Sequence, residues 1–258
     1  MVSRMRATKK TIRLRFLIIA IMMVMQAKTS QLEIVRLAPG LERQASEALA
    51  RAFFVDPLIV YYVPDENMRR RALPVFMRVM LRYTLAHGEV WTTPGLDGLA
   101  CWLPPGQTEL GNWGLVQASL GVVPLRVFGA FLRQTRANGS SPLNVRQLVR
   151  RVSQTEGRFD QIHKEIVPGP HWYLMTLAVE PARQGQGIGS RLIAPMLERA
   201  RAANLPCYLE TMTELDVAFY RKNGFQVARQ ETIQPGDLAS WALVRWPEDG
   251  KREKALNH

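Results

Sequence analysis

Cysteine and histidine are both scarce in this chain. Its 258 residues include two cysteines, Cys101 and Cys207, and four histidines that are scattered along the sequence. Each cysteine lies in an apolar stretch that we expect to form a separate strand, so buried free thiols are favoured over a disulfide. No spacing of cysteine and histidine is typical of a metal site, and we therefore predict no bound metal.

Acidic residues are missing from the first thirty positions. Residues 1–30 contribute seven of the positive charges behind the net charge of +12, which leaves +5 for the remainder of the chain. A net charge of +5 is ordinary for a protein that binds a polyanionic ligand. We therefore do not predict a nucleic acid as a partner.

The N-terminal apolar run is short. Residues 16–25 are ten apolar residues, which suit the core of a signal peptide and are too few for a comfortable membrane span. The basic start also resembles an organellar transit peptide, and a basic, hydrophobic membrane anchor is a further alternative. We interpret residues 1–30 as an extension outside the fold, and residues 247–258 as a polar tail.

Glycine is concentrated in one informative stretch, Gln184–Gly189. Its three glycines fit neither the dinucleotide pattern nor the Walker loop. They lie between an apolar run at residues 172–179 that predicts a strand and an amphipathic run from Ile188 to Ala203 that predicts a helix. Uncovered N–H groups at such a helix start can hold a phosphate, and no acidic residue lies between Pro181 and Leu197. The alternative is a left-handed turn without a ligand.

Further elements follow this turn in a regular order. Residues 206–211 predict a short buried strand that contains Glu210, and a helix from Asp216 is ended by Asn223-Gly224. Residues 171–231 therefore read as strand, glycine turn, helix, strand, helix and strand.

This order and its motifs resemble the GNAT family of N-acetyltransferases. The family's acetyl-CoA signature is Gln/Arg-x-x-Gly-x-Gly/Ala, and its three fixed positions are occupied here by Gln184, Gly187 and Gly189. The second recurring element of the family matches Phe219-Tyr220 followed by Gly224-Phe225.

Within the family, the chain is similar to the puromycin N-acetyltransferase-like members. The similarity covers most of residues 32–246, and its diagnostic part is residues 171–231.

The resemblance implies the fold class. We expect an α/β (α+β) domain over residues 31–246, with a mixed, mostly antiparallel central sheet flanked by helices. Upstream, the pattern predicts a strand at 32–37, helices at 41–53 and 66–86, and a hairpin at 90–103. Residues 107–169 form an expected helical insert, which would either wall an acceptor pocket or cap the sheet. Residues 171–231 are the expected acetyl-CoA-binding core.

The family's way of holding acetyl-CoA implies a set of binding residues. The pantetheine arm lies against the strand before the glycine turn, where a backbone N–H would also stabilise the oxyanion. The diphosphate is held by the turn itself. The implied residues are Leu177, Ala178, Val179, Gln184, Gly185, Gln186, Gly187, Ile188, Gly189 and Ser190. Asp216 stands where relatives carry Asn; it would accept from a pantetheine N–H or cap the helix.

Two side chains are the candidate catalytic residues. Tyr220 matches the family's tyrosine beside the acetyl-CoA sulfur, and a phenol can protonate the leaving thiolate. The alternative for Tyr220 is a buried aromatic ring beside Phe219. Glu210 is the candidate general base, acting through a water, because partial burial would raise its pKa towards neutrality. The alternative for Glu210 is a strand-end charge that faces solvent.

The leading hypothesis is an acetyl-CoA-dependent N-acetyltransferase that acts on a small-molecule amine without a metal. Acetylation of a protein lysine or N-terminus remains an alternative, as does a non-catalytic acyl-CoA-binding module. Because acetyl-CoA is intracellular, we expect a cytoplasmic protein, with membrane association or organelle targeting through residues 1–30 as the alternatives. The sequence predicts neither the acceptor nor the oligomeric state.

Overall fold

The structure is a computed structural model that describes residues 33–108, 117–120, 145–234 and 236–247. The extension expected at residues 1–30 and nearly all of the expected tail lie outside these residues. Across the part of the chain that the structure describes, no helix combines the length and apolar character needed to cross a membrane.

Seven strands form one sheet in the order β1-β2-β3-β4-β5-β7-β6. Only β4 and β5 pair in parallel, and every other neighbouring pair is antiparallel. The mixed, mostly antiparallel sheet of the prediction is therefore confirmed. The strands are β1 (Val35–Arg36), β2 (Glu89–Thr92), β3 (Gly98–Leu103), β4 (Trp172–Val179), β5 (Cys207–Thr211), β6 (Gln226–Ile233) and β7 (Leu238–Arg245).

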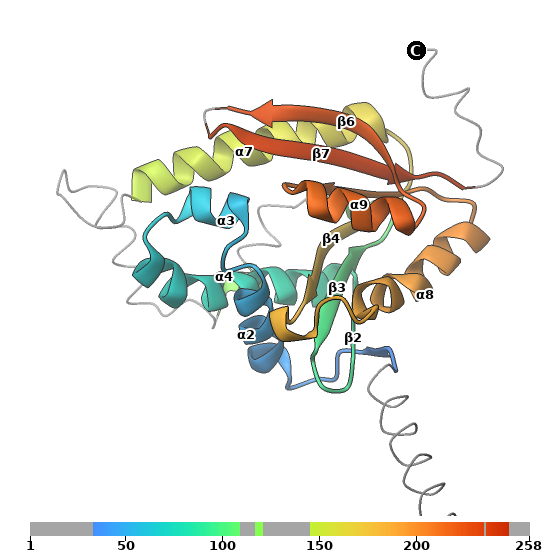
Figure 1. Cartoon of the computed structure of the whole chain (residues 1–258), viewed down its shortest axis with the longest axis horizontal. Coiled ribbons are helices and arrows are strands. Elements are labelled where there is room, and N and C mark those ends of the chain that lie inside the picture. The colour runs from blue at the N-terminus through green and yellow to red at the C-terminus, as the bar shows by residue number, and fades with distance from the viewer. Residues whose placement is uncertain (1–32, 109–116, 121–144, 235, 248–258) are drawn as a thin grey trace, which may run out of the picture.

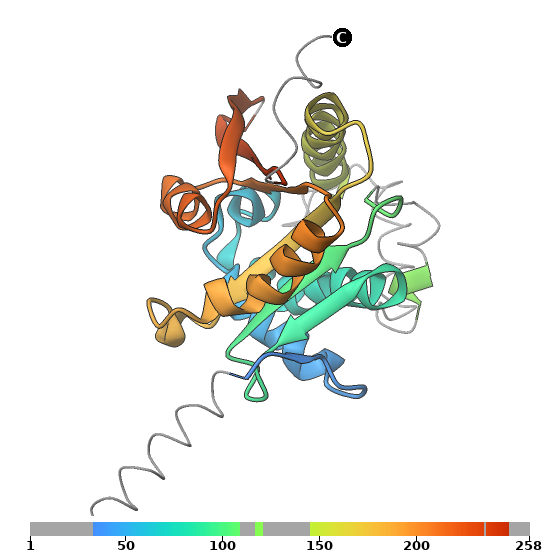
Figure 2. The same ribbon diagram turned by 90° about the vertical axis from the view of Figure 1, so that its right-hand side faces the viewer.

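Helices cover both faces of the sheet (Figures 1 and 2). The face that packs against α8 and α9, called the α8 face below, contributes residues such as Leu209 and Leu243 to one core cluster. The opposite face, called the α7 face, packs against α2 and α4 over one half and against α3 and α7 over the other. The helices are α2 (Glu42–Ala52), α3 (Pro57–Tyr62), α4 (Glu66–His87), α7 (Val145–Ile166), the short 3-10 helix η1 (Pro181–Arg183), α8 (Ile188–Ala202) and α9 (Glu214–Lys222).

A β-bulge interrupts the pairing of β4 with β3. Cys101 lies opposite Thr176 and Trp102 lies opposite Leu174, so Met175 is the extra residue on β4. A bulge bends its strand and increases the local twist. The parallel pairing of β4 with β5 is limited to Trp172 with Cys207 and Tyr173 with Tyr208, which lie before the bulge. Beyond that pairing the two strands separate, and this opening is called the β4–β5 gap below.

Helix α3 was not predicted from the sequence. The helical pattern of residues 41–53 ends before Asp56-Pro57, and the sequence analysis expects no further helix until residue 66. Instead, the Asp56 side chain accepts hydrogen bonds from the N–H groups of Leu58 and Ile59, and Pro57 is the first helical residue. An N-cap aspartate followed by proline is a helix start signal, so the dipeptide marks a beginning as well as an end.

The insert expected at residues 107–169 is only partly described. Its helical residues within the described part are 117–119 and α7, and residues 109–116 and 121–144 of the insert lie outside it. Helix α7 covers β6 and β7 on the α7 face, with Phe159 and Ile162 in the same buried cluster as Ala242 and Val244. The capping role considered for the insert therefore applies to α7.

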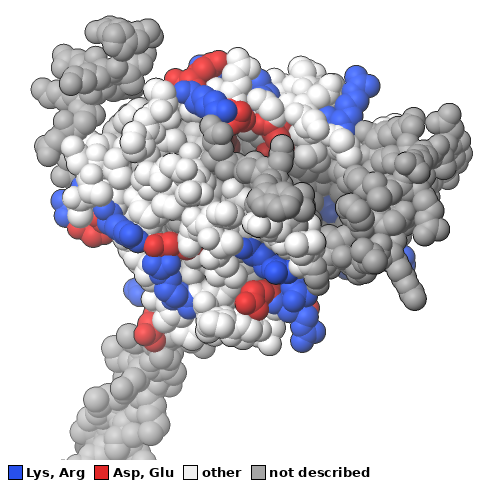
Figure 3. Space-filling model, turned by 180° about the vertical axis from the view of Figure 1, so that it is seen from behind, with Lys and Arg blue, Asp and Glu red and all other residues white. Residues whose placement is uncertain are grey.

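Acidic and basic side chains are interspersed on the face of the molecule that Figure 3 shows. Most of the ion pairs in the described residues join arginine to a carboxylate, and one carboxylate, Glu89, is shared by two arginines. The carboxylates in these pairs are Glu66, Glu89, Asp97, Asp160, Glu165, Glu180, Glu198 and Glu231.

Candidate functional site

The glycine turn lies at the start of α8, as its sequence predicts. Gly185 and Gly187 both have left-handed backbones, with φ of 75° and 77°, which favours glycine at each position. The first hydrogen bond of the helix is donated by the Arg191 N–H to the Gly187 oxygen, and no side chain caps the N-terminus. The N–H groups of Ile188, Gly189 and Ser190 therefore have no partner within the helix.

The surroundings of this turn suit an anion. Residues 184–187 are exposed, and a Cβ added at Gly185 or Gly187 would meet no atom within 4 Å. The first turn of α8 has no acidic residue. The positive end of the helix dipole is therefore open to a ligand, so the turn fits a diphosphate.

Strand β4 presents backbone groups to the β4–β5 gap. The Glu180 N–H donates to the backbone oxygen of Asp97, which immediately precedes β3. Along two antiparallel strands, opposite residues alternate between hydrogen-bonded and non-hydrogen-bonded pairs. By this alternation Ala178 turns its N–H and C=O towards β3, while Leu177 and Val179 turn theirs into the gap. The Gln184 side chain, which donates to the Val179 oxygen at 3.2 Å, agrees with this direction. An extended amide chain could thus bond to Leu177 and Val179.

Tyr220 lies on α9 on the α8 face of the sheet. Its ring is buried in the main core cluster and packs edge-on against Phe219 and Phe225. Burial, reinforced by the negative charge of Asp216, raises the pKa of Tyr220. The phenol is therefore protonated at neutral pH, as a proton donor must be.

Glu210 lies on β5 and belongs to the α7 face, since it pairs with Ala242, a member of the cluster on that face. Burial raises the pKa of Glu210 to about 7, although the neighbouring phenols of Tyr208 and Tyr173 lower it in part. The expected shift towards neutrality is therefore present. A carboxylate with such a pKa is half ionised near pH 7 and can accept a proton there.

A second carboxylate, Glu156 on α7, faces the same region. The Tyr62 hydroxyl at the end of α3 donates to Glu156 Oε1 at 2.8 Å and also contacts the Thr155 hydroxyl. Burial raises the pKa of Glu156, and its charge contributes to the raised pKa of Glu210. Helices α3 and α7 thus add polar groups to the α7 face beside Glu210.

Two buried histidines lie behind these groups. His163 Nε2 and His171 Nε2 are 2.6 Å apart, and His171 Nδ1 is 2.6 Å from the Gly169 oxygen. Because a carbonyl oxygen only accepts, His171 carries its proton on Nδ1 and His163 donates from Nε2. Burial lowers the pKa of His163 to about 3 and also lowers that of His171, so both rings are neutral. His163 stacks on Tyr208 at 4.0 Å between ring centroids.

Asp216 fits the capping alternative. Thr213 is the N-cap of α9, its hydroxyl accepts from the Asp216 N–H, and the Thr213 and Thr211 hydroxyls both donate to Asp216 Oδ2. Asp216 thus holds the N-cap hydroxyl of Thr213 in place instead of capping the backbone N–H of Thr213. Asp216 Oδ1 has no hydrogen bond within the described residues, so the geometry leaves one oxygen for a ligand.

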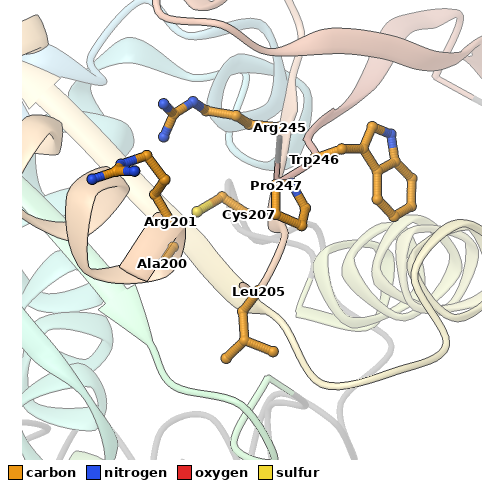
Figure 4. Close-up of a pocket in the computed structure, with 7 residues that line it drawn as sticks. All are labelled: Ala200, Arg201, Leu205, Cys207, Arg245, Trp246 and Pro247. Carbon is orange, nitrogen blue, oxygen red and sulfur yellow. The ribbon is translucent and has the colours of Figure 1, made fainter. Parts of the chain in front are cut away.

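A shallow pocket elsewhere on the protein is unrelated to these groups (Figure 4). It opens at the other end of β5 from Glu210, beside Cys207, and is lined by Arg201 and Arg245 among others. Cys207 and Cys101 are free and buried, and burial raises the pKa of each thiol to about 12, so neither is a nucleophile at neutral pH. Within the described ranges no three His, Cys, Asp or Glu side chains gather as metal ligands.

The glycine turn and the end of β4 adjoin the gap. Tyr220 packs on the α8 face in the same core cluster as Leu177 and Val179, and Glu210 lies on the α7 face of β5. The sequence analysis missed Asp56, Glu156, Tyr62, Tyr173 and Tyr208. Asp56 had a signal, the N-cap aspartate before proline, while the others are ordinary helix and strand residues that only the fold brings together.

Comparison with known proteins identifies a matching family and similar sequences. A family model described as an acetyltransferase (GNAT) domain matches residues 152–227, from within α7 to the start of β6. An uncharacterised N-acetyltransferase of Schizosaccharomyces pombe is 23% identical over 193 residues, which are 71% of this chain and 70% of that protein.

Two further similarities are one to a short stretch of sequence and one to the fold. The N-alpha-acetyltransferase RimI of Mycobacterium tuberculosis is 47% identical over 53 residues, 20% of this chain and 32% of that protein. The crystal structure of a histone acetyltransferase HPA2 and related acetyltransferase from Corynebacterium glutamicum superposes with a TM-score of 0.55 at 17% identity, covering 84% of this chain and 97% of that one. At that identity the superposition establishes the fold alone.

Proposed function

The chain is a member of the GNAT family of acetyltransferases, and on this premise we propose that it transfers the acetyl group of acetyl-CoA to the amine of a small molecule. The observation that carries the proposal is the β4–β5 gap, which has a proton donor on one face and a proton acceptor on the other. Tyr220 lies on the α8 face and Glu210 on the α7 face. Donor and acceptor would therefore meet within the gap.

The donor substrate is bound mainly by backbone groups. The free N–H groups at the start of α8 bind the diphosphate of acetyl-CoA, and the exposed edge of β4 at Leu177 and Val179 bonds to the pantetheine amides. An N–H of this edge also lies beside the thioester carbonyl, where it stabilises the negative charge that forms on the oxygen. Asp216 keeps α9 in position and offers Oδ1 to a pantetheine N–H.

The chemical step needs three proton transfers. Ionised Glu210 takes a proton from the substrate ammonium, directly or through a water, and the neutral amine nitrogen then bonds to the carbonyl carbon. The bond from that carbon to sulfur breaks as Tyr220 gives its proton to the departing thiolate, and the second proton lost by the nitrogen returns to Tyr220 as the amide forms. The protein residues exchange only protons, so no covalent intermediate with the enzyme is required. Because its donor is intracellular, we place the reaction in the cytoplasm.

A direct assay tests the proposal. Purified protein is incubated with acetyl-CoA and a panel of amines, and free thiol is measured over time. We expect amine-dependent thiol release that falls in Glu210→Gln and Tyr220→Phe but not in Glu198→Gln, an exposed carboxylate paired with Arg201. Absence of stimulation by every amine, together with absence of thermal stabilisation by acetyl-CoA, would contradict the proposal.

A protein N-terminus is a second candidate acceptor. It is favoured by the 47% identity to RimI over 53 residues, since that relative is named an N-alpha-acetyltransferase. Helices α3 and α7 cover the α7 face, which leaves less room for a polypeptide than for a small amine. Short peptides with free N-termini in the same assay distinguish the two, because a peptide acetyltransferase would acetylate them faster than any small amine.

A further inference from the structure

Two tyrosines lie beside Glu210 on the α7 face of the sheet. Tyr208 and Glu210 are two residues apart on β5, so their side chains leave the strand on the same side. Tyr173 lies opposite Tyr208 on β4, where the two strands pair in parallel, and the two rings are 5.9 Å apart between centroids. The register of the two central strands therefore brings both phenols to the carboxylate.

Both phenol hydroxyls are hydrogen-bonded to Glu210. An ionised carboxylate only accepts hydrogen bonds, so each phenol donates. Tyr208 is fully buried, and within the described residues its hydroxyl has no partner other than Glu210. A buried hydroxyl is costly to leave unsatisfied, and this cost keeps the Tyr208 donor directed at the carboxylate.

The Tyr208 ring is held in turn from the helix side. His163 of α7 stacks on it, with 4.0 Å between the ring centroids and 13° between the ring planes. His163 is hydrogen-bonded to His171, and His171 to the Gly169 oxygen, so the stacked imidazole cannot turn without breaking a buried hydrogen bond. A chain of contacts thus runs from the backbone of Gly169 to the ring whose hydroxyl binds Glu210.

The donors that hold Glu210 are neutral. Glu210 forms no ion pair within the described residues, whereas Glu231 of β6 and Glu165 of α7 each pair with an arginine. A cation beside a carboxyl group lowers its pKa by more than a neutral donor does. The phenols lower the pKa of Glu210 less than burial raises it, and the pKa stays at about 7. Neutral donors therefore orient the carboxylate and leave it basic enough to accept a proton near neutral pH.

We propose that Tyr208 and Tyr173 are positioning residues, whose two hydrogen bonds hold the carboxylate of Glu210 in one orientation for proton transfer. This inference rests on the proposed function, in which Glu210 is the general base. The two phenols act through Glu210 and not on the reacting atoms. They use two of the acceptor positions of the carboxylate, so the remaining positions are available to the amine or to a water.

Tyr208→Phe removes one donor and keeps the ring that stacks on His163. Loss of a hydrogen bond to the ionised form raises the pKa of the carboxyl group, so the midpoint of the pH profile of kcat/KM should move up by about one pH unit. With one acceptor amine, kcat/KM at about pH 6 should fall about tenfold below that of the unaltered protein and should largely recover by about pH 9. A purely structural defect would lower kcat/KM equally at every pH.

The other groups around Glu210 and Tyr208 are the same in both proteins, so they do not account for a difference between the two profiles. These titratable and charged groups are Tyr62 of α3, which donates to Glu156, Glu156 and His163 of α7, Tyr173 of β4, and Arg229 and Glu231 of β6.

Tyr173→Phe is the second variant, and it keeps the inference testable if Tyr208→Phe does not fold. It removes the other donor and should move the midpoint in the same direction. Tyr83→Phe is the control, since Tyr83 is a buried tyrosine of a different core cluster, and it should leave the midpoint unchanged. An unchanged midpoint in both Tyr208→Phe and Tyr173→Phe would overturn the inference, while amine-dependent thiol release would leave the acetyltransferase proposal standing.

A titration without turnover separates the two proposals. In protein labelled with ¹³C at the side-chain carboxyl of glutamate, the NMR signal of Glu210 is the one that is missing from Glu210→Gln. We expect this signal to titrate near pH 7 in the unaltered protein and in Tyr83→Phe, and about one pH unit higher in Tyr208→Phe. A higher midpoint in Tyr208→Phe without turnover of any amine would retain the hold on Glu210 and reject the proposed function. Equal midpoints in Tyr208→Phe and the unaltered protein would count against the role of Tyr208.

Discussion

On the α8 face of the β4–β5 gap, the groups proposed to bind the donor are mainly backbone N–H and C=O groups from one continuous segment, residues 177–190. On the α7 face, the groups that surround the proposed general base are side chains from α3, α7, β4 and β5. The first set depends on glycines that hold an exposed turn open. The second depends on carboxylates and phenols whose pKa values are raised by burial.

This contrast indicates that the acceptor side of the site can change its ligand more easily by substitution than the donor side. A backbone-built anchor needs only a few small residues, so its sequence is short and its ligand is fixed by geometry. A pocket built from side chains changes its ligand whenever one side chain changes. We therefore expect substitutions on the α7 face to alter acceptor choice and catalysis, and those in the turn to alter donor affinity. Three predictions test this division, beginning with the largest effect, and a fourth concerns the buried histidine pair behind Tyr208.

Glu210→Gln should have the largest effect, lowering kcat/KM about 10²- to 10³-fold, because a neutral amide cannot accept the proton. In the unaltered protein, kcat/KM should rise with pH through about 7, since the pKa of Glu210 is about 7 and only its ionised form is active. The groups facing it are Tyr173, Tyr208 and Glu156. The measurement is thiol release against pH.

The variant should lose the rise near pH 7 and keep its thermal stabilisation by acetyl-CoA, because donor binding depends on the other face. An unchanged pH profile in Glu210→Gln would assign the base to another group. Glu198→Gln, an exposed carboxylate, serves as the control for the loss of one charge.

Tyr220→Phe should lower kcat about ten- to a hundredfold while the KM for the acceptor stays unchanged, because only the leaving thiolate loses its proton donor. Steady-state kinetics at saturating acetyl-CoA measure both constants. Tyr83→Phe, which changes a buried tyrosine of a different core cluster, is the control and should leave kcat unchanged. Equal activity of Tyr220→Phe and the unaltered protein would favour the interpretation of Tyr220 as a core ring.

A substitution in the glycine turn should affect donor binding and leave catalysis nearly unchanged. Gly187→Ala forces a left-handed backbone on a residue with a side chain, which costs about 1–2 kcal/mol of stability. It also adds a Cβ where the diphosphate would lie, so the KM for acetyl-CoA should rise about tenfold with little change in kcat.

Gly40→Ala is the matched control for that prediction. Gly40 has φ of 88° and open space around its added Cβ, but lies between β1 and α2. The two variants should lose similar stability in thermal unfolding, and only Gly187→Ala should change the KM for acetyl-CoA. An equal KM in both variants would contradict the role of the turn.

The same division explains what the sequence could predict. The glycine turn, β4 and α9 are contiguous patterns, and Gln184, Gly187 and Tyr220 could be assigned from them. The bulge at Met175 leaves no pattern, since the extra residue is apolar like its neighbours. Glu156 is one charged residue among many on an amphipathic helix, and only tertiary packing brings it to Glu210. Asp56-Pro57 is a helix start signal, but it lies directly after the preceding helical pattern, and the helix that it starts has only six residues.

The smallest effect is expected for the buried histidines His163 and His171, and it concerns the stability of the protein. Because burial lowers the pKa values of His163 and His171, the unfolded chain binds more protons than the folded one below pH 6.5. The histidine contribution to the free energy of unfolding is therefore complete above pH 6.5 and declines as the pH falls. The neighbouring charges are Asp160 and Lys164 of α7, and Tyr173 and Tyr208 pack against His163 from the sheet.

His163→Gln removes one of these groups and keeps a donor for His171. We expect the variant to have a lower free energy of unfolding than the unaltered protein at neutral pH. This difference should shrink by up to about 1.4 kcal/mol per pH unit as the pH falls below 6.5, because only the unaltered protein loses the contribution of His163. Urea unfolding of the variant and of the unaltered protein between about pH 7 and pH 5 measures this difference. The stability contributions of Glu156 and Glu210 change with pH in the opposite direction, but they are the same in both proteins and cancel. His87→Gln, at the end of α4, is the control. Parallel curves would mean that His163 is protonated in the folded protein, which would contradict the neutral pair inferred behind Tyr208.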